Sequence, residues 1–415
     1  MSLPPDAWPP GLLDRLHALY EDLHRHPELS GHEHRTAGKA ARALADAGYE
    51  VTEGVGGTGV VGVLANGAGP VVMLRADMDA LPVAEETGLP YASQVYADGP
   101  DGGPVPVAHA CGHDMHVTCL AGAATLLAAV RASWSGTLLV VFQPAEELAT
   151  GARAMIDDGL FERFPRPDIV LGQHVGPLPA GMIGHREGAV MAGADAASVE
   201  LYGRGGHGSR PEATVDPVLM AASVVVRLQG VVAREVPPQE TAVLTVGRLQ
   251  AGTVSNVIPE TAQLGISLRS YTPEVRQLLR TAVERIVTAE ATASGSPKPP
   301  VIDWLPAAPV LVSDPEQTRA VVADLAAHFG QDKMLPLPQI AASEDVGHLG
   351  EAAGVPTVFW FWGGPDAETV VTAFLEGRFD ELPSNHSARF APVAEPTITT
   401  GVEALAVAAL GRFGR

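Results

Sequence analysis

Two residues in the segment His109-Ala-Cys-Gly-His-Asp114 have side chains that bind metal ions, the thiol of Cys111 and the imidazole of His113. Thiolate and imidazole are both usual ligands at zinc sites. Taken alone, the pair is equally well explained as a buried thiol beside a core histidine. A metal site therefore needs further ligands elsewhere in the chain.

Candidate ligands of this kind occur at three more places, as the pairs Asp77 and Asp79, Glu146 and Glu147, and the single residue His174. Two adjacent glutamates allow one carboxylate to bind metal while the other serves as general base. One catalytic zinc usually keeps three protein ligands, and the set is larger than that. We therefore expect two metal ions roughly 3.5–4 Å apart.

The expected secondary structure brings these segments together. Short β-branched runs predict strands at 71–74, 137–142, 168–171 and 357–360, and apolar periodicity predicts helices at 12–23, 36–47, 116–130 and 397–410. Strands that alternate with helices predict an α/β sheet covered on both faces. Each candidate ligand could be a turn or helix-terminus residue, but the carboxylates and His174 follow strands, where sites of such sheets form.

The middle of the chain has a different pattern, strand-helix-strand-strand-helix-strand, with elements at 197–202, 216–231, 242–249, 263–270, 272–293 and 300–305. This order predicts a small α+β domain of the split-βαβ, ferredoxin-like kind. We predict a catalytic domain of residues 1–187 and 303–415, and an inserted lid domain of residues 188–302. The Pro- and Gly-rich joints at 178–181 and 295–300 are the expected hinges.

The inserted segment carries its own polar candidates. His207 lies in a glycine-rich loop, Asn256 stands before a proline turn, and Arg269 ends a strand. Donors of this kind suit an oxyanion and a substrate carboxylate. Ordinary turns with a surface arginine explain them as well.

Composition narrows the class of protein. The 415 residues carry a formal net charge of −21, which argues against nucleic acid or an anionic membrane as partner. Two cysteines exclude a disulfide framework and favour the cytoplasm, and no signal-peptide pattern is visible. Polar residues interrupt the apolar stretches before membrane-spanning length.

Seven motifs occur in the order of a known family: Arg75–Pro82, His109–His116, Gln143–Glu147, Gly205–Pro211, Asn256–Pro259, Ser343–Asp345 and Ser384–Ser387. The chain resembles the M20 metallopeptidase/amidohydrolase family, specifically its aminoacylase and hippurate-hydrolase branch (subfamily D), which also contains plant auxin-conjugate hydrolases. The resemblance covers essentially the whole chain.

The resemblance implies roles for named residues. It implies metal ligands at Cys111, His113, Glu147, His174 and His386, and it makes Glu146 the general base. Asp77 matches an aspartate that orients a metal-site group, and His207 matches a lid histidine that steadies the oxyanion, often in a partner subunit's site. Asn256 and Arg269 match positions that hold the substrate's carbonyl or carboxylate. The inserted domain corresponds to a lid or dimerisation domain, so a homodimer is expected.

One motif departs from the wider family. Its usual His-x-Asp is here Arg75-Ala-Asp77, so one ligand is missing, and Cys111 with His113 is expected to compensate. Either Cys111 or Asp114 could bridge the metals, and we favour Cys111. Cys111 should then lie against the metals, and Arg75 should not.

The expected reaction is hydrolysis of an N-acyl amino acid by a metal-activated water, with two divalent ions drawn from zinc, manganese, cobalt and nickel. A dipeptidase or carboxypeptidase using the same site is the enzymatic alternative. A metal-dependent binding protein without turnover is the other.

Overall fold

The computed structural model describes residues 3–4, 7–99 and 102–413, and within them the chain forms two compact units. Unit 1 comprises the described residues up to Val190, Val312–Gln339, and those from Asp345 onward. Unit 2 comprises Met191–Leu311 and Ile340–Glu344. The outermost predicted limits, 1 and 415, and part of the N-terminal segment in which no signal peptide was expected lie outside the described residues.

The inserted unit therefore begins and ends later than the predicted 188–302, and it gains a short segment near residue 340. The expected hinges were also wrong. Residues 178–181 connect two strands inside unit 1, and residues 295–300 connect a helix to a strand inside unit 2. Proline and glycine mark turns, and these two turns do not coincide with the crossings between units.

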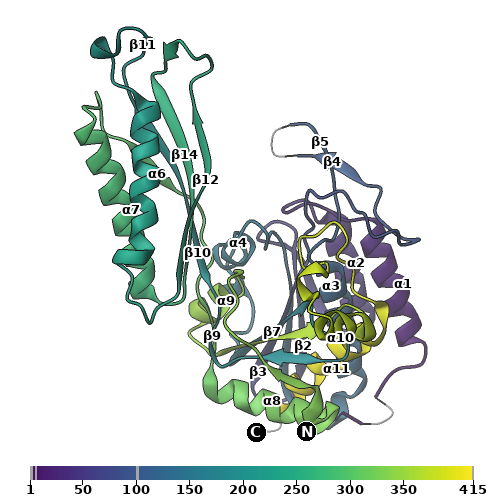
Figure 1. Cartoon of the computed structure of the whole chain (residues 1–415). Coiled ribbons are helices and arrows are strands. Elements are labelled where there is room, and N and C mark those ends of the chain that lie inside the picture. Colours follow the sequence, from purple (N-terminus) through teal and green to yellow (C-terminus); the bar gives the residue numbers. More distant parts are fainter. Residues whose placement is uncertain (1–2, 5–6, 100–101, 414–415) are drawn as a thin grey trace. The chain divides into compact units, whose positions relative to one another are not determined.

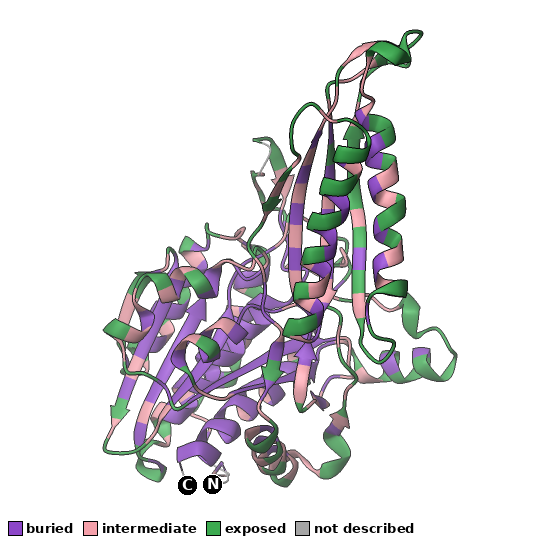
Figure 2. Cartoon of the chain, turned by 90° about the vertical axis from the view of Figure 1, so that its left-hand side faces the viewer, coloured by how far each residue is buried: buried purple, intermediate pink, exposed green. Residues whose placement is uncertain are grey.

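Unit 1 is built on an eight-stranded mixed sheet with the order β1-β2-β6-β3-β7-β18-β8-β17. Figure 1 labels β2, β3 and β7 of this sheet. Its strands are β1 (Glu50–Val55), β2 (Gly59–Asn66), β3 (Val71–Asp77), β6 (Gly136–Gln143), β7 (Ile169–Gly176), β8 (Ile183–His185), β17 (Met334–Pro336) and β18 (Thr357–Gly363). The central strands β6, β3, β7 and β18 run parallel. They are buried along most of their length, as Figure 2 shows, which explains their continuous apolar runs.

Helices cover both faces of this sheet. One face carries the main core under α1 (Leu12–Arg25), α2 (His34–Asp46), α3 (His113–Ala129), α8 (Pro315–Phe329) and α11 (Ala394–Phe413). The other face carries α4 (Gly151–Asp157), α5 (Leu160–Arg163) and α9 (Gly347–Ala353). Helix α3 is buried on nearly every side between the sheet, α1, α2 and α11, which explains its alanine-rich sequence. Unit 1 also contains α10 (Ala367–Leu375) and the pair β4 (Tyr96–Asp98) and β5 (Pro104–Pro106), while the paired strands β9 (Gly188–Met191) and β16 (Leu311–Ser313) contain the two boundaries at Val190 and Val312.

Unit 2 has the predicted strand and helix order. Its strands β10 (Gly193–Tyr202), β12 (Ala242–Ala251), β14 (Thr261–Ser270) and β15 (Val301–Trp304) form an antiparallel sheet ordered β12-β14-β10-β15. Helices α6 (Pro217–Arg234) and α7 (Pro273–Ala293) pack on the sheet, and each starts at a capping side chain, Asp216 or Thr272, followed by proline. A two-stranded ladder, β11 (Gly206–His207) with β13 (Val257–Ile258), completes the unit.

Helix α6 corrects one expectation. Among the described residues it is the one helix whose 18 residues are long and apolar enough, by length and composition, to cross a membrane, whereas no stretch of that length was expected. Its buried positions, among them Met220, Val224 and Leu228, face the core of unit 2. Packing against the sheet explains these positions, whereas Leu219 and Val226 of the same helix are apolar and exposed.

Candidate metal centre and active site

The candidate site lies at the carboxyl ends of three parallel strands of unit 1. Asp77 is the last residue of β3, and the loop after β6 carries Glu146 and Glu147. His174 comes from β7, but it lies inside the strand rather than at its end, because β7 extends to Gly176. The parallel ladders place these three segments side by side at one edge, as the strand pattern predicted.

A glycine turn delivers Cys111 and His113 to the same edge. Gly112 has φ +82°, and a Cβ atom there would lie 2.5 Å from Cγ1 of Val175. Only glycine fits both the backbone conformation and the close approach. Helix α3 starts at His113, three residues before the predicted start, so His113 belongs to the helix rather than to the loop before it. His116, one turn further, lies on the same side of α3.

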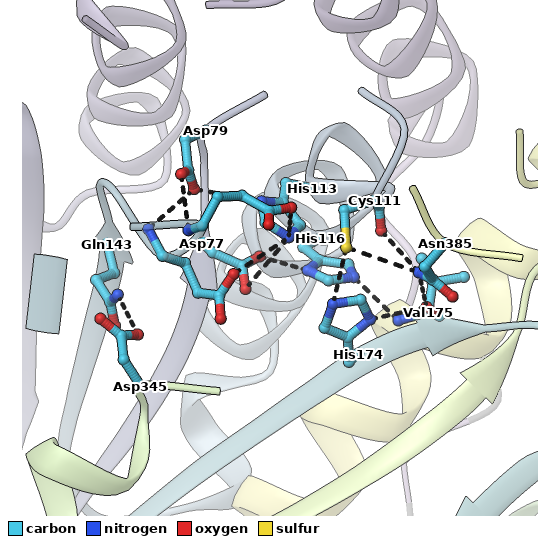
Figure 3. Close-up of polar contacts among 12 residues, drawn as sticks. Asp77, Asp79, Cys111, His113, His116, Gln143, His174, Val175, Asp345 and Asn385 are labelled. Atoms are coloured by element: carbon cyan, nitrogen blue, oxygen red, sulfur yellow. Dashed lines mark hydrogen bonds and ion pairs between the residues drawn. The ribbon is translucent and has the colours of Figure 1, made fainter. Parts of the chain in front are cut away.

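Donor atoms of Cys111, His113 and Glu147 lie within 4.8 Å of one another (Figure 3 shows the first two). Oε1 of Glu147 is 3.9 Å from Nε2 of His113. Neither of these two atoms has a hydrogen-bond partner among the described residues, although both are buried. Buried polar atoms without partners are costly, and a bound cation would satisfy both.

His174 faces Cys111 from β7. Its Nε2 lies 3.5 Å from Sγ of Cys111, and its Nδ1 lies 2.8 Å from the carbonyl oxygen of Val175. A carbonyl oxygen only accepts, so Nδ1 carries the proton and Nε2 presents a lone pair toward the sulfur. Burial lowers the pKa of His174 well below its usual value, which keeps the ring neutral as a metal ligand requires.

His386 reaches the cluster from the C-terminal part of the chain. Its Nε2 is 3.4 Å from Oε2 of Glu147, and its backbone N–H donates to the carbonyl of Ala110. The preceding side chain, Asn385, donates to the carbonyl oxygens of Cys111 and Val175 at 3.1 Å each. These bonds hold His386 beside Glu147 although its φ of +72° is unfavourable for a non-glycine residue.

The electrostatics of the cluster suit a cation. Burial raises the pKa of the Cys111 thiol to about 12, so the thiolate is stable at neutral pH only when a positive charge lies against it. The donors are one sulfur, imidazoles and carboxylates, the set used by zinc and by neighbouring divalent ions. The residues present therefore fit a metal centre.

Asp77 lies beside this cluster and connects it to Arg75. Its two carboxylate oxygens accept from Nδ1 of His116 and, at 2.7 Å, from the Arg75 guanidinium. Burial alone would raise the pKa of Asp77, but His113, His116 and Arg75 outweigh it and hold that pKa well below the usual range. Nε2 of His116 accepts from the backbone N–H of Val175, so both ring nitrogens of His116 are engaged by the protein.

The guanidinium of Arg75 donates to two carboxylates and one side-chain amide. Besides Asp77 it donates to Gln143 at 2.9 Å and to Asp345 at 3.0 Å, and its side chain is almost fully buried. Gln143 also donates to the same oxygen of Asp345. Arg75 thus contacts Asp77, whose donor atom forms with those of His113, His116 and His174 a second group within 4.8 Å of one another.

Asp114, the alternative bridging residue, points elsewhere. Its Oδ2 is 2.6 Å from Nδ1 of His24, and its Oδ1 accepts from the backbone N–H of Met115. His24 also contacts Glu85 through Nε2 at 2.9 Å. Asp114 therefore belongs to a buried network around His24, whereas Cys111 lies among the donors.

Sequence reasoning did not single out His116, and it took Asp79 for a candidate metal ligand without foreseeing its contacts with the glutamate turn. Asp79 accepts from the backbone N–H groups of Glu146 and Glu147, and its Oδ1 is 3.3 Å from Nδ1 of His113. The helical spacing of His113 and His116 was a usable signal for the first. For Asp79 no local pattern distinguishes a turn residue from one that holds a loop 67 positions away.

The polar candidates of unit 2 fall into two groups. His207 and Asn256 lie together in the β11–β13 ladder, where Gly208 donates to the carbonyl of Asn256. Arg269 is at the far end of the ten-residue strand β14, about 30 Å away along the strand, where it contacts Ser343. A small molecule cannot touch both groups of one unit 2 at once.

Comparison with known proteins identifies the family. Residues 73–381 match the model of peptidase family M20/M25/M40. Hippurate hydrolase of Campylobacter jejuni is 43% identical over 66% of this chain and 70% of its own length. N-acetylcysteine deacetylase of Bacillus subtilis is 38% identical over 72% of this chain and 76% of its own length. The chain belongs to the M20 family.

A solved structure supports the same assignment. The YXEP protein of Bacillus subtilis, described as a dinuclear metal-binding peptidase of the M20 family, superposes with a TM-score of 0.77 at 30% identity, over 97% of this chain and 99% of that one. The protein is accordingly a metal-dependent M20 amidohydrolase or peptidase, with a mixed α/β catalytic fold. The predicted family and fold class are confirmed.

Proposed function

We propose that this M20 protein hydrolyses the amide bond of N-acyl amino acids, using two divalent metal ions held by Cys111, His113, Glu147, His174 and His386. The observation that carries the proposal is the arrangement of the adjacent glutamates. Glu147 lies between ring nitrogens of His113 and His386, whereas Oε2 of Glu146 is 4.0 Å from Nε2 of His113. We assign metal binding to Glu147, because it also lies beside His386, and the proton transfer to Glu146.

The proposed reaction uses these residues as follows. Bound divalent ions would polarise the amide carbonyl and acidify the attacking water. Glu146 takes the proton of that water as it attacks the carbonyl carbon, and it then gives the proton to the departing amine nitrogen. The buried edge of the sheet around Cys111 and His174 excludes bulk water, which strengthens each charge interaction.

The relatives support this substrate class. Hippurate and N-acetylcysteine, named in the two relatives, are both amino acids acylated on nitrogen. A carboxypeptidase is the second candidate, because thermostable carboxypeptidase 1 of Saccharolobus solfataricus is 38% identical over 64% of this chain. Both activities would use the same metal centre and would differ in the group on the acyl side.

Unit 2 is proposed to serve as lid and dimerisation domain. His207 would steady the oxyanion, and Asn256 and Arg269 would hold the substrate's carbonyl or carboxylate. Because His207 and Asn256 lie at the opposite end of unit 2 from Arg269, we infer that these groups serve different active sites of a homodimer. Leu219 and Val226 on α6 are apolar and exposed, and they would provide a surface for the proposed second copy.

A substrate panel tests the proposed function. The purified protein, reconstituted separately with zinc, manganese, cobalt and nickel, is assayed on hippurate, N-acetyl amino acids and dipeptides. We expect kcat/KM on at least one N-acyl amino acid to exceed that on every dipeptide by about tenfold or more. Faster hydrolysis of dipeptides would favour the peptidase, and no hydrolysis of any amide with any metal would favour a binding protein.

A further inference from the structure

The turn that carries Glu146 and Glu147 is held by two carboxylates from distant parts of unit 1. The backbone N–H of Ala145 donates to Oε1 of Glu33 at 2.9 Å. The N–H of Glu146 donates to Oδ1 of Asp79 at 3.1 Å, and the N–H of Glu147 donates to Oδ2 of Asp79 at 3.0 Å. Three successive backbone donors thus end on buried carboxylates.

This turn needs outside partners to keep its shape. Strand β6 ends at Gln143, so the following N–H groups have no ladder partner. Ala145 adopts φ +48°, a left-handed conformation that a residue with a Cβ rarely takes without support. Buried N–H groups also require acceptors. Glu33 and Asp79 meet both needs.

Both carboxylates are themselves fixed. Oε2 of Glu33 accepts from the Thr58 hydroxyl at 2.5 Å, and its Oε1 also accepts from the Gly31 N–H at 2.8 Å. Oδ2 of Asp79 accepts from the Ser30 hydroxyl at 2.6 Å. Both side chains are almost completely buried. Their oxygens therefore cannot turn away without leaving several donors unpaired.

Asp79 reaches two parts of the centre at once. It binds the backbone of both glutamates, and its Oδ1 lies 3.3 Å from Nδ1 of His113. The same carboxylate therefore contacts both the backbone of Glu146 and the ring of His113, and it helps to fix the distance between these two residues. The segment of residues 28–33, which carries Glu33, is bound next to Asp79, because the backbone N–H of Ala80 donates to the carbonyl oxygen of Glu28.

We propose that Glu33 and Asp79 form a carboxylate clamp, defined by these two residues, whose role is to position the general base Glu146 through its backbone. Neither residue touches the reacting atoms, so both are positioning residues. The inference rests on the proposed function for the role of Glu146. The clamp itself rests only on the hydrogen bonds, burial and backbone conformation of the turn.

The test compares Asp79→Asn and Glu33→Gln with the matched control Glu28→Gln. An amide in place of Asp79 presents an N–H₂ group to a backbone N–H, which cannot accept it. Glu28 is a suitable control because its carboxylate also accepts backbone N–H groups, those of Arg35 and Thr36, but none from the turn. Hydrogen exchange of the peptide covering residues 143–150 and steady-state kinetics at saturating metal are measured for each protein.

We expect exchange at the amides of Glu146 and Glu147 to accelerate about tenfold in Asp79→Asn, since a lost hydrogen bond opens the turn. We expect kcat to fall about 100-fold while KM stays within about threefold, because misplacement of the base affects the chemical step more than binding. Metal content, measured by elemental analysis, should equal that of the unsubstituted protein. Glu28→Gln should change neither exchange at 143–150 nor kcat.

Two results would overturn the inference. Unchanged hydrogen exchange at residues 143–150 in Asp79→Asn and Glu33→Gln would show that the clamp does not hold the turn. Faster exchange with unchanged kcat would show that the clamp holds the turn but has no role in catalysis. If no amide is hydrolysed by the unsubstituted protein while exchange still accelerates in the variants, the proposed function fails and the clamp stands. Should Asp79→Asn not fold, Ser30→Ala removes one donor from Asp79, and its kcat should fall about threefold with KM unchanged.

Discussion

Sγ of Cys111 lies 3.5 Å from Nε2 of His174, although 63 positions separate the two residues in the chain. The hydrogen bond from Nδ1 of His174 to the Val175 carbonyl fixes which nitrogen faces the sulfur. A thiol and an imidazole lone pair directed at one point, both buried, are the arrangement that a divalent cation completes.

Substitution of Cys111 should therefore weaken metal binding. We expect Cys111→Ser to raise the metal dissociation constant about 10- to 100-fold, because a hydroxyl is a much poorer ligand than a thiolate for these ions. Competition with a chelator, followed by elemental analysis, measures the change. The matched control is Cys119→Ser, whose buried thiol lies near the Ile398 carbonyl and outside the cluster. Equal losses in both variants would contradict a special role for Cys111.

Replacing the proposed general base should separate catalysis from metal binding. In Glu146→Gln we expect kcat to fall by about 10²–10⁴-fold, because the amide cannot take the proton of the attacking water. Metal content should stay unchanged, since Glu147 rather than Glu146 lies beside both His113 and His386. Elemental analysis and initial rates on an N-acyl amino acid provide the two measurements. A variant that remains fully active would exclude Glu146 as the base.

Removal of Arg75 should destabilise the protein. Arg75→Met leaves the buried carboxylates of Asp77 and Asp345 without their shared guanidinium, and breaking such a buried ion pair costs about 3–5 kcal/mol. The free energy of unfolding in urea checks this. Arg75→Lys should recover only part of the loss, because one ammonium cannot reach Asp77, Gln143 and Asp345 with the geometry of a guanidinium. If Arg75→Lys had the same free energy of unfolding as the unsubstituted protein, the positive charge alone would explain the stabilisation by Arg75.

The network of His24 predicts a pH dependence of stability. Burial disfavours the imidazolium, but Asp114 and Glu85 outweigh it and raise the pKa of His24 to about 10. In the unfolded chain a histidine titrates near about 6.5, so the folded state binds the extra proton between these values. The contribution of charged His24 to the free energy of unfolding is therefore complete below about pH 6.5 and is lost as pH rises toward 10.

The variant His24→Gln tests that dependence. The free energy of unfolding of the unsubstituted protein should fall between about pH 6.5 and 10 more steeply than that of the variant, and the two curves should differ most at the lower pH, by roughly 3–5 kcal/mol. Urea denaturation at several pH values gives both curves. Parallel curves across this range would show that His24 is not charged in the folded protein.

The proposed dimer depends on the exposed face of α6. Val226→Glu, at a residue 74% exposed, should shift the protein from dimer to monomer in light scattering coupled to size-exclusion chromatography. Phe374→Glu is the control, because it changes an equally exposed residue, 70%, on unit 1. A dimer that survives the first change but not the second would place the interface on unit 1.

Much of the fold could be predicted because the strands of unit 1 are continuous apolar runs and those of unit 2 alternate with amphipathic helices. The four central strands of unit 1 and the order of the six main elements of unit 2 were predicted, whereas β1, β2, β8 and β17 of the unit 1 sheet and the helices α4, α5, α8, α9 and α10 were not. Boundaries were less accurate where tertiary contacts extend an element: β7 continues through His174 because it pairs with β18 up to Gly363, and α3 starts early at the Gly112 turn.

The candidate site was only partly predictable. Cys111, His113, the two glutamates and His174 have side chains whose chemistry is visible in the sequence. Asp79 and Glu33 act through the backbone of other segments, and Arg75 acts through Asp77 and Asp345, so their importance depends on contacts between residues far apart in the chain. No local pattern encodes such contacts.

The donors of the metal centre are divided by unit 2 in the sequence, and this affects the order of events during synthesis. Cys111, Glu147 and His174 leave the ribosome before unit 2, whereas β18, which lies between β7 and β8 in the sheet, and His386 leave long after it. Most of unit 2 is a continuous segment and can complete its core first. The nascent chain therefore cannot assemble the proposed ligand set until unit 2 and the segment that carries His386 have been synthesised, and we expect the complete set to bind metal only after that point.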